Sequence, residues 1–323
     1  MKKTFCKTFF ISLIVFLVIW GFYIYETVFN APEEEDVAYK ENFIDRMSNT
    51  KDNITFLLLG IDARDVMESK GTRTDTMMLC RADKSTGELS ILSIPRDTKA
   101  YIRGRKNEEI ITHAHAYGGP ELSMETVQDL LGVDVEYYVK VDYNIVKEFV
   151  SLVDGVAVDV PMDMKYSDPT ADPPLYINLT KGYQTLDGDQ ALQFLRFRKG
   201  DKGYPDLPDG DLGRIRSQQQ FIEAGMEKIL MPSNIVKIPQ MAKSFYNNVD
   251  TNIPMDVVAK FAMKAKNFGT DKVEMATLPG EALYLDRWYF IMDEEASQTL
   301  VKAMFLDQMA VKNLDKIQDE ETN

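Results

Sequence analysis

The sequence predicts a mixed α/β fold, with a central β-sheet flanked by helices, behind a single N-terminal transmembrane helix. Short apolar runs bounded by turn residues alternate with longer segments of helical periodicity. A short turn joins two of the apolar runs, whereas a helix-like segment joins two others, so antiparallel and parallel neighbours are both expected. An uncharged apolar run follows a basic stretch at the N-terminus, which is typical of a membrane anchor.

The composition describes an ordinary folded protein. The chain has 323 residues, of which 45% are hydrophobic and 27% are charged. Its 51 acidic and 37 basic residues give a formal net charge of -14, which argues against a general nucleic-acid binder, and we expect no nucleic-acid partner. The two cysteines, Cys6 and Cys80, do not make a disulfide framework.

The N-terminal region has the pattern of an uncleaved signal anchor. Residues 8–25 carry no charge and, as a helix rising about 1.5 Å per residue, come close to the ~30 Å hydrocarbon core of a bilayer. Lysines precede this run and acidic residues follow it, which places the N-terminus in the cytoplasm. The alternative, a cleaved signal peptide, lacks a small-x-small site close after the run.

We therefore expect a single-pass protein of the cell membrane whose folded part is extracytoplasmic. The predicted parts are a cytoplasmic N-terminus at 1–8, a transmembrane anchor at 9–25, an extracytoplasmic stalk at 26–50, a folded domain at 51–305 and a polar acidic tail at 306–323.

The elements of the folded domain are predicted in chain order. Three strands are expected at 54–60, 75–82 and 88–95, the last two joined by the turn sequence DKSTG. A helix over 119–132 has Pro120 in its first turn and Gly132 after its end. A strand–helix–strand unit is expected over 135–161, followed by helices at 187–198 and 210–230. The remainder, to about residue 305, alternates helix and short strand.

Charged residues stand where the first three predicted strands begin or end. Asp62 follows the first strand, Arg73 and Asp75 stand at the start of the second, and Arg96 and Asp97 close the third. If the second strand runs antiparallel to both neighbours, all five side chains emerge at one edge of the sheet. Carboxylates and guanidiniums gathered there indicate a site, although exposed ion pairs of little energetic value are the simpler interpretation of each pair alone.

The helix over 210–230 contributes a second charged group. Asp211, Arg214 and Gln218 are spaced three and four apart and share one face. Ile215 lies beside that face and should point into the core, so Arg214 is expected at the margin between core and cleft, partly desolvated. Arg216 points away and should be solvated.

Two further arginines, Arg196 and Arg198, end the preceding helix. The loop over 199–210 is rich in Gly, Pro and Asp and has the composition of a mobile flap. Free N–H groups at the start of the next helix favour anions, and planar Arg side chains bind phosphate in a bidentate way. A phosphate or pyrophosphate site is therefore expected.

Histidine and cysteine offer no complete metal site in the sequence. His113 and His115 make an incomplete zinc site, so positioning or capping roles are expected for them. The carboxylates of Asp62 and Asp75 remain as candidate ligands for a hard ion such as Mg²⁺, which keeps water and bridges phosphate oxygens.

Several motifs occur in one order along the chain: FLLLGIDAR, RTDTMML, LSIPRDT, HAYGG, GVAVDVP, LDGDQALQFLRFR, GDLGRIRSQQQ and LPGE. Together they make the sequence resemble the LytR–CpsA–Psr family of bacterial cell-envelope proteins over about residues 50–300. The resemblance implies a catalytic domain of the LytR–CpsA–Psr (LCP) type over 51–305. It also implies an extracytoplasmic phosphotransferase, which moves a glycopolymer from a polyprenyl-pyrophosphate carrier to peptidoglycan. The polymer could be teichoic acid, capsule or another secondary polysaccharide.

The resemblance also assigns roles to residues. It implies that Asp62 and Asp75 hold Mg²⁺. The implied pyrophosphate-binding residues are Arg73, Arg96, Arg196, Arg198, Asp211, Arg214 and Gln218. The expected catalytic residues are Asp75, Arg73, Arg96 and Asp97, of which either aspartate could deprotonate the acceptor hydroxyl.

Two departures from the family pattern stand out. Many relatives have Arg where this chain has Ser217, and the loop over 199–210 is longer than in compact relatives. Two other functions stay open: a pyrophosphate hydrolase using the same site, and a non-catalytic, membrane-anchored regulator or scaffold that binds the lipid.

Overall fold

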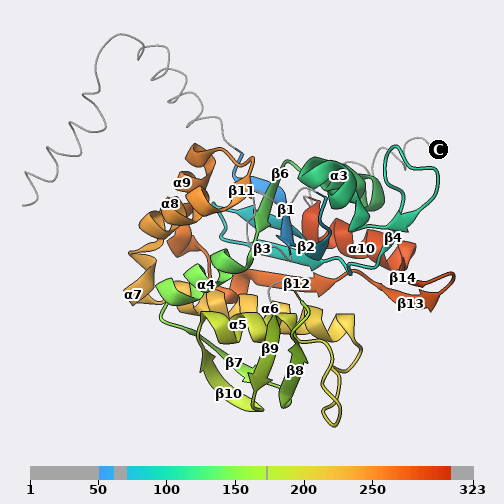
Figure 1. Ribbon diagram of the computed structural model, residues 1–323. Coiled ribbons are helices and arrows are strands. Elements are labelled where there is room, and N and C mark those ends of the chain that lie inside the picture. The colour runs from blue at the N-terminus through green and yellow to red at the C-terminus, as the bar shows by residue number, and fades with distance from the viewer. Residues whose placement is uncertain (1–50, 62–70, 172–173, 307–323) are drawn as a thin grey trace, which may run out of the picture. The chain divides into compact units, whose positions relative to one another are not determined.

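The computed structural model describes residues 51–61, 71–171 and 174–306. Its centre is a six-stranded sheet in the order β11-β6-β1-β2-β3-β12 (Figure 1). The strands are β1 (Asn53–Ile61), β2 (Thr74–Asp83), β3 (Leu89–Ser93), β6 (Tyr137–Val141), β11 (Asp250–Thr251) and β12 (Val273–Thr277). β2 is antiparallel to β1 and β3, whereas β1 is parallel to β6 and β3 is parallel to β12. The predicted antiparallel meander and mixed sheet are confirmed.

One face of the sheet packs against α3 (His113–Leu131) and α10 (Glu294–Phe305). Alternate residues of β1 and β2, including Leu57, Leu59 and Met77, point to this side and join the largest apolar core. α3 begins six residues earlier than predicted and is kinked at Gly118 and Gly119. The kink follows from Pro120, because the residue before a proline is pushed out of the α region.

The other face of the sheet packs against α6 (Asp211–Ile229) and α9 (Met255–Met263). α4 (Tyr143–Leu152), α5 (Gly188–Arg196), α7 (Pro232–Ile235) and α8 (Ile238–Asn248) complete this side. The helix expected within 135–161 is α4, and the predicted helices at 187–198 and 210–230 are confirmed as α5 and α6, with ends differing by a residue or two.

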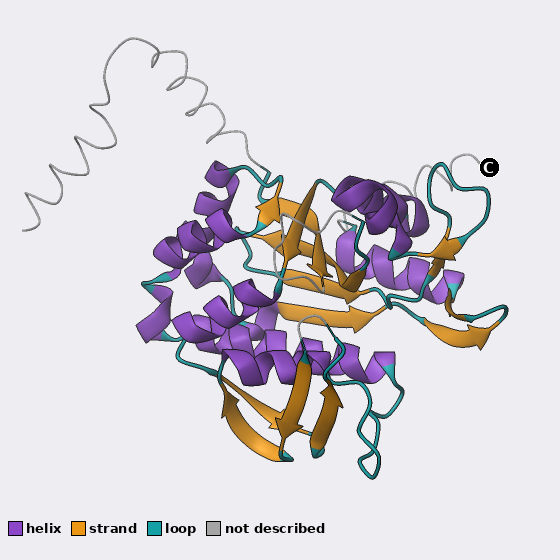
Figure 2. Cartoon of the chain, in the orientation of Figure 1, coloured by secondary structure: helices purple, strands orange, loops and turns teal. Residues whose placement is uncertain are grey.

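Four short strands lie beyond α5 and α6, on the side away from the central sheet (Figure 2). They are β7 (Val156–Val160), β8 (Met164–Asp168), β9 (Leu175–Leu179) and β10 (Gly182–Leu186), paired as β7 with β10 and β8 with β9. The predicted strand–helix–strand unit over 135–161 is therefore wrong as a single-sheet unit, because β6 and β7 lie in different sheets. Val156, Val158 and Val160 bury instead in a second core with Phe194 and Phe197.

Two hairpins complete the described part of the chain. β4 (Lys99–Ala100) pairs with β5 (Glu109–Ile110), and β13 (Gly280–Tyr284) pairs with β14 (Trp288–Met292). The short 3-10 turns are η1 (Ala265–Asn267) and η2 (Thr270–Lys272). In the part of the chain that the structure describes, none of the helices combines the length and the apolar character needed to cross a membrane. The predicted anchor, stalk and tail lie outside these residues, apart from Leu306.

Candidate active site

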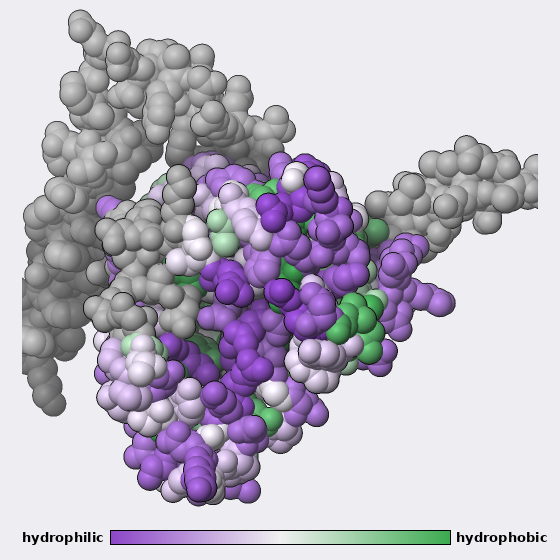
Figure 3. Space-filling view, turned by 45° about the vertical axis from the view of Figure 1, so that its right-hand side comes forward, coloured by the Kyte–Doolittle hydropathy of each residue, from purple (hydrophilic) through white to green (hydrophobic). Residues whose placement is uncertain are grey.

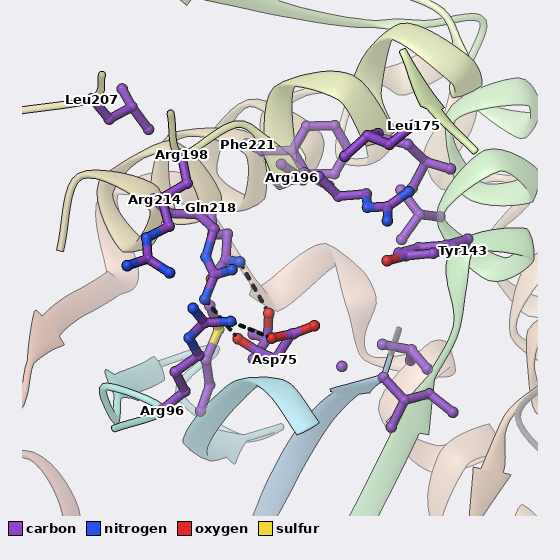
Figure 4. Close-up of a pocket in the computed structure, with 18 of the residues that line it drawn as sticks. Asp75, Arg96, Tyr143, Leu175, Arg196, Arg198, Leu207, Arg214, Gln218 and Phe221 are labelled. Atoms are coloured by element: carbon purple, nitrogen blue, oxygen red, sulfur yellow. Dashed lines mark hydrogen bonds and ion pairs between the residues drawn. The ribbon is translucent and has the colours of Figure 1, made fainter. Parts of the chain in front are cut away.

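A cleft of about 670 Å³ lies between the α6 face of the central sheet and the helices α4, α5 and α6. β1 and β2 form one wall through Leu58, Gly60, Thr76 and Met78. These residues alternate with those that face the core under α3, so the pleat of each strand separates core from cleft. Figure 4 shows charged side chains gathered around Asp75 at one end of the cleft.

The charged end is built from four side chains on three elements. Asp75 stands at the start of β2, Arg96 lies in the turn after β3, and Asp211 and Arg214 occupy the first turn of α6. Arg96 Nη1 donates to Asp75 Oδ1 at 2.5 Å, and Arg96 Nε lies 3.4 Å from Asp211 Oδ1. The same Asp211 oxygen lies 2.6 Å from Arg214 Nη2, which also donates to the backbone carbonyl of Asp75 at 3.1 Å.

This arrangement desolvates two positive charges next to each other. Burial lowers the pKa of the Arg214 guanidinium, and the nearby positive charge of Arg96 adds to this, while Asp211 opposes both. Burial also acts to lower the pKa of Arg96, but Asp211 and Asp75 outweigh it and raise that pKa. The two guanidiniums therefore depend on carboxylates for their countercharge.

Part of the donor capacity of this cluster is unused. Arg214 Nε and Arg96 Nε are buried and make no hydrogen bond among the described residues, although Arg96 Nε makes the ion pair given above. Buried guanidinium donors without an acceptor are costly, so an arriving anion would gain strong, charge-assisted hydrogen bonds. The cluster is therefore suited to a phosphate group.

Gln218 lies one turn further along α6 and faces the same cleft. Its Nε2 donates to Thr76 Oγ1 at 2.9 Å, which ties α6 to β2. Thr76 lies directly opposite Gly60 on β1, and a Cβ at Gly60 would stand only 2.9 Å from the Thr76 Cβ. Glycine at position 60 thus leaves room for the threonine that holds Gln218.

Arg196 and Arg198 bring two more positive charges to the cleft from the end of α5. The Arg196 guanidinium lies 4.5 Å above the Tyr143 ring, a cation–π contact (Figure 4). Arg198 is exposed and close enough to Arg214 and Asp97 to affect the pKa of both groups. Tyr143 is a cleft residue that the motif reasoning missed, and its position at the start of a predicted helix gave no signal.

Asp97 borders the charged end. Its Oδ2 lies 3.9 Å from Arg96 Nε, and its side chain is 38% exposed. Burial raises the pKa of this carboxyl above its ordinary value, despite the positive charge of Arg96. A carboxylate with a raised pKa beside a phosphate site can act as a proton acceptor.

The predicted gathering at one sheet edge is confirmed for Asp75, Arg96 and Asp97. Arg73 does not line the cleft; it is exposed, and its charge acts on Tyr117 of α3. Arg73 lies just before β2, where the backbone is not yet held in the sheet, so strand pairing does not direct its side chain to the cleft. Asp62 lies outside the described residues.

The positions around Arg214 on α6 are as predicted. Arg214 is 7% exposed and Ile215 is buried, whereas Arg216 is exposed and pairs with Asp209 at 2.8 Å. Ser217 is also buried. Arg216 therefore binds the loop that precedes α6.

The loop over 199–210, whose composition suggests a mobile flap, is held in place by several contacts. Asp201 N donates to Lys165 O at 2.8 Å and Leu207 N donates to Arg198 O at 3.0 Å. Leu207 is 5% exposed and belongs to the second core. This loop forms part of the cleft wall, and it connects α5 to the first turn of α6.

His115 supports the segment that leads into Asp75. It is 2% exposed, and its Nδ1 lies 2.8 Å from the carbonyl oxygen of Thr72. Burial lowers the pKa of this imidazole, so the neutral form donates from Nδ1 to the carbonyl. His113 instead contacts the Glu109 carboxylate at 3.1 Å. Positioning roles, as expected, fit both histidines.

The remaining walls of the cleft are largely apolar. They are formed by Ile61, Val141, Val146, Leu175, Leu192, Leu195, Leu207, Phe221 and Ile222. Figure 3 shows hydrophilic residues gathered over the centre of one face of the molecule. A charged end and an apolar remainder suit a ligand that carries a phosphate head on a hydrocarbon chain.

Two bacterial transferases have sequences similar to this chain over most of its length. TagV of Bacillus subtilis, a polyisoprenyl-teichoic acid–peptidoglycan teichoic acid transferase, is 30% identical over 297 residues, which are 88% of this chain and 73% of TagV. TagU of Bacillus licheniformis, a transferase of the same description, is 30% identical over 309 residues, 94% of this chain and 95% of TagU.

Solved structures agree with the sequence relatives. The crystal structure of B. subtilis TagV has a TM-score of 0.65 at 29% identity and covers 79% of this chain and 98% of the TagV chain. The structure of TagT bound to LI-WTA has a TM-score of 0.60 at 28% identity and covers 79% of this chain and 90% of the TagT chain. The LytR–CpsA–Psr family model matches residues 19–305, so the chain belongs to the LytR–CpsA–Psr family.

Proposed function

We propose that the protein is a membrane-anchored, extracytoplasmic phosphotransferase that moves a glycopolymer from a polyprenyl-pyrophosphate carrier to peptidoglycan. The observation that carries this proposal is the cleft itself, which has guanidiniums at one end and apolar walls over the rest. A polyprenyl pyrophosphate has the same division into charged head and hydrocarbon tail. The teichoic acid transferases TagV and TagU, which have similar sequences, support the transfer reaction.

The pyrophosphate head would bind at the charged end. Arg96 and Arg214 would bind the bridging and terminal oxygens, and Arg198 would add charge from the mouth of the cleft. The isoprenoid chain would lie along the apolar wall of β1, α4 and α5. Phosphoryl transfer depends chiefly on positioning and charge neutralisation, which these residues supply without a covalent intermediate.

In the proposed reaction, a hydroxyl of the acceptor sugar attacks the phosphorus that carries the glycopolymer. The bond between that phosphorus and the bridging oxygen breaks, and polyprenyl phosphate leaves with the electron pair. Asp97 accepts the proton from the attacking hydroxyl, and Arg96 and Arg214 stabilise the charge on the departing phosphate. The product is a phosphodiester between glycopolymer and peptidoglycan.

In this proposal Mg²⁺ would bind through Asp75. Mg²⁺ is commonly bound by one or two carboxylates together with phosphate oxygens and water. The Asp75 side chain is 39% exposed at the cleft, and Arg96 engages only its Oδ1. Within residues 51–61, 71–171 and 174–306, no three His, Cys, Asp or Glu side chains group together as ligands. Asp62, the other predicted ligand, lies outside these residues, and phosphate oxygens and water would supply further ligands. Bound there, Mg²⁺ would neutralise pyrophosphate charge.

The test is reconstitution with the full chain in detergent. The protein is incubated with a polyprenyl-pyrophosphate-linked glycan, Mg²⁺ and un-crosslinked peptidoglycan oligomers, and the products are identified by mass spectrometry. We expect glycan joined to peptidoglycan, lost in Arg96→Ala and retained in Arg216→Ala, which removes an exposed arginine of α6. Glycan phosphate released without conjugate would identify a hydrolase, and unchanged substrate bound to the protein would identify a scaffold.

A further inference from the structure

The β13–β14 hairpin carries a group of exposed aromatic and aliphatic side chains at its tip, residues 283–288. Leu283 is 44%, Tyr284 61%, Leu285 48% and Trp288 62% exposed. Two residues further along β14, Phe290 is only 5% exposed and belongs to the main core. The base of the hairpin is thus fixed in the core, while the tip projects from it (Figure 1). Large exposed apolar groups of this kind mark interaction surfaces.

The two rings of the tip form a defined pair. Tyr284 and Trp288 are directly opposite in the antiparallel register, and their ring centroids lie 5.5 Å apart at an interplanar angle of 70°. Leu285 N donates to Arg287 O at 2.9 Å across the turn. Edge-to-face contact and the closed turn hold the rings in place before any partner binds, which lowers the entropy cost of binding.

The hairpin is joined directly to the candidate active site. Phe290 N donates to the backbone carbonyl of Asp97 at 2.9 Å, and Thr98 and Phe290 form a parallel bridge. Trp288 is two residues from Phe290, about 7 Å along the strand. Arg96 lines the cleft, and the residue after it, Asp97, accepts the hydrogen bond from the hairpin, so Asp97 connects the edge of the cleft to β14. A group held on the tip would therefore lie near Asp97, at the edge of the charged end.

We propose that the hairpin tip is the docking surface for the sugar chain of the acceptor, with Tyr284 and Trp288 stacking against its pyranose rings. This inference rests on the proposed function, which requires a sugar hydroxyl at Asp97. The C–H groups on one face of a pyranose ring are weakly positive and pack on the negative face of an aromatic ring. Asp286 and Arg287, whose side chains are 67% and 56% exposed, lie beside the rings and can bind sugar hydroxyls or amides.

Charge favours a sugar chain over a lipid surface at this tip. Residues 280–292 contain Glu281, Asp286 and Arg287, which give two negative charges and one positive charge. Surfaces that bind anionic membranes carry an excess of Lys and Arg, and acidic residues at the headgroup level oppose binding. A neutral glycan has no such conflict.

The experiment uses the full chain in detergent with Trp20→Phe. Because the sequence has two tryptophans, Trp288 then supplies all of the tryptophan emission. Titration with un-crosslinked peptidoglycan oligomers should shift that emission to shorter wavelength, and Tyr284→Ala should weaken the fitted affinity about five- to tenfold. Tyr183→Ala, which removes a 78% exposed tyrosine of β10, should leave the affinity unchanged. No emission shift, or an equal loss in the control, would overturn the proposal.

Kinetics then separate this surface from the chemistry. In the transfer assay, Trp288→Ala should raise the KM for peptidoglycan oligomers about five- to tenfold, with kcat and the KM for the lipid-linked glycan unchanged, and Trp288→Phe should restore most of the affinity. If the protein binds oligomers through the tip but forms no conjugate, the proposed function fails and the docking surface stands. If conjugate forms with an unchanged KM in Trp288→Ala, the surface is wrong and the function stands. An emission shift with phosphatidylglycerol vesicles instead of oligomers would assign the tip to a lipid surface.

Discussion

Replacing Asp211 by Asn tests whether the guanidiniums of buried Arg214 and partly buried Arg96 form an anion site. Asp211 Oδ1 lies 2.6 Å from Arg214 Nη2 and 3.4 Å from Arg96 Nε, and the Asp211 side chain is 17% exposed. Removing one partner of a buried ion pair costs about 3–5 kcal/mol, because the other charge is left unpaired. Partial exposure and solvent screening reduce this to about 2–4 kcal/mol. For a domain of this size the melting temperature should fall by roughly 4–16 °C.

Pyrophosphate should reverse much of this loss. In Asp211→Asn the two arginines lack part of their countercharge, so a bound anion relieves more repulsion in the variant than in the wild type. Ligand that binds only the folded state raises stability in proportion to the logarithm of its concentration over Kd. The melting temperature should therefore rise more in Asp211→Asn than in the wild type when inorganic pyrophosphate is added. Thermal unfolding followed by circular dichroism, with and without pyrophosphate, measures both effects.

Asp209→Asn is the matched control for this measurement. Asp209 pairs with Arg216, but both side chains are more than half exposed, and such pairs contribute little. Its positive φ of 61° is also tolerated by Asn. An equal melting temperature in Asp211→Asn and Asp209→Asn, or an equal gain from pyrophosphate in wild type and Asp211→Asn, would refute the reasoning.

Three further predictions concern single side chains. His115→Phe leaves the Thr72 carbonyl without its donor and should lower the free energy of unfolding, measured by denaturant titration, by about 1–3 kcal/mol. His115→Asn should regain part of this stability, and an unchanged stability in His115→Phe would contradict the hydrogen bond. Burial raises the pKa of Asp97, so the folded protein holds this proton more tightly than the unfolded chain does. The resulting stabilisation of the folded protein is present below about pH 3.8 and is lost as pH rises through the pKa of the folded state. Asp97→Asn should therefore gain stability over the wild type from pH 3 to pH 6, and a constant difference would exclude this. Burial raises the pKa of Cys80 to about 12, so in a Cys6→Ser background a thiol reagent at pH 8 should label it only on unfolding; fast labelling of the folded protein would place the thiol at the surface.

The sequence predicted those parts of the site that depend on local periodicity. The spacing of Asp211, Arg214 and Gln218 placed them on one helix face, and the structure confirms it, with Arg214 buried and Arg216 in solvent. Turn sequences and apolar runs likewise predicted the antiparallel strands whose shared edge holds Asp75 and Arg96. Helix and strand periods determine which side chains lie on the same face, so such arrangements can be read locally.

Features that depend on contacts between distant segments could not be read in this way. The sequence 155–161 has the pattern of a buried strand, but no local signal shows that it joins a separate sheet with β10 instead of β6. The contact of Arg196 with Tyr143 joins two residues more than 50 positions apart in the sequence. Arg73 and Asp75 are two residues apart, a spacing that places both side chains on one face of a strand. The strand, however, starts only at Thr74, after Arg73. These features are set by tertiary packing.

The conformation of the loop over 199–210 also depends on contacts between distant segments. Its Gly, Pro and Asp content indicated a flap, because composition reports backbone preferences and not tertiary contacts. Leu207 buries in the second core, and Gly200 N donates to Asp206 Oδ1 at 3.0 Å, so one apolar residue and a few hydrogen bonds shape the segment.

The structure of the full chain with a bound polyprenyl pyrophosphate tests the central claim most directly. We expect the pyrophosphate between Arg96, Arg198 and Arg214, with the hydrocarbon chain running along Leu58, Leu192 and Leu195. A pyrophosphate bound elsewhere on the protein, or a hydrocarbon chain outside the cleft, would contradict the proposed site and the reaction derived from it.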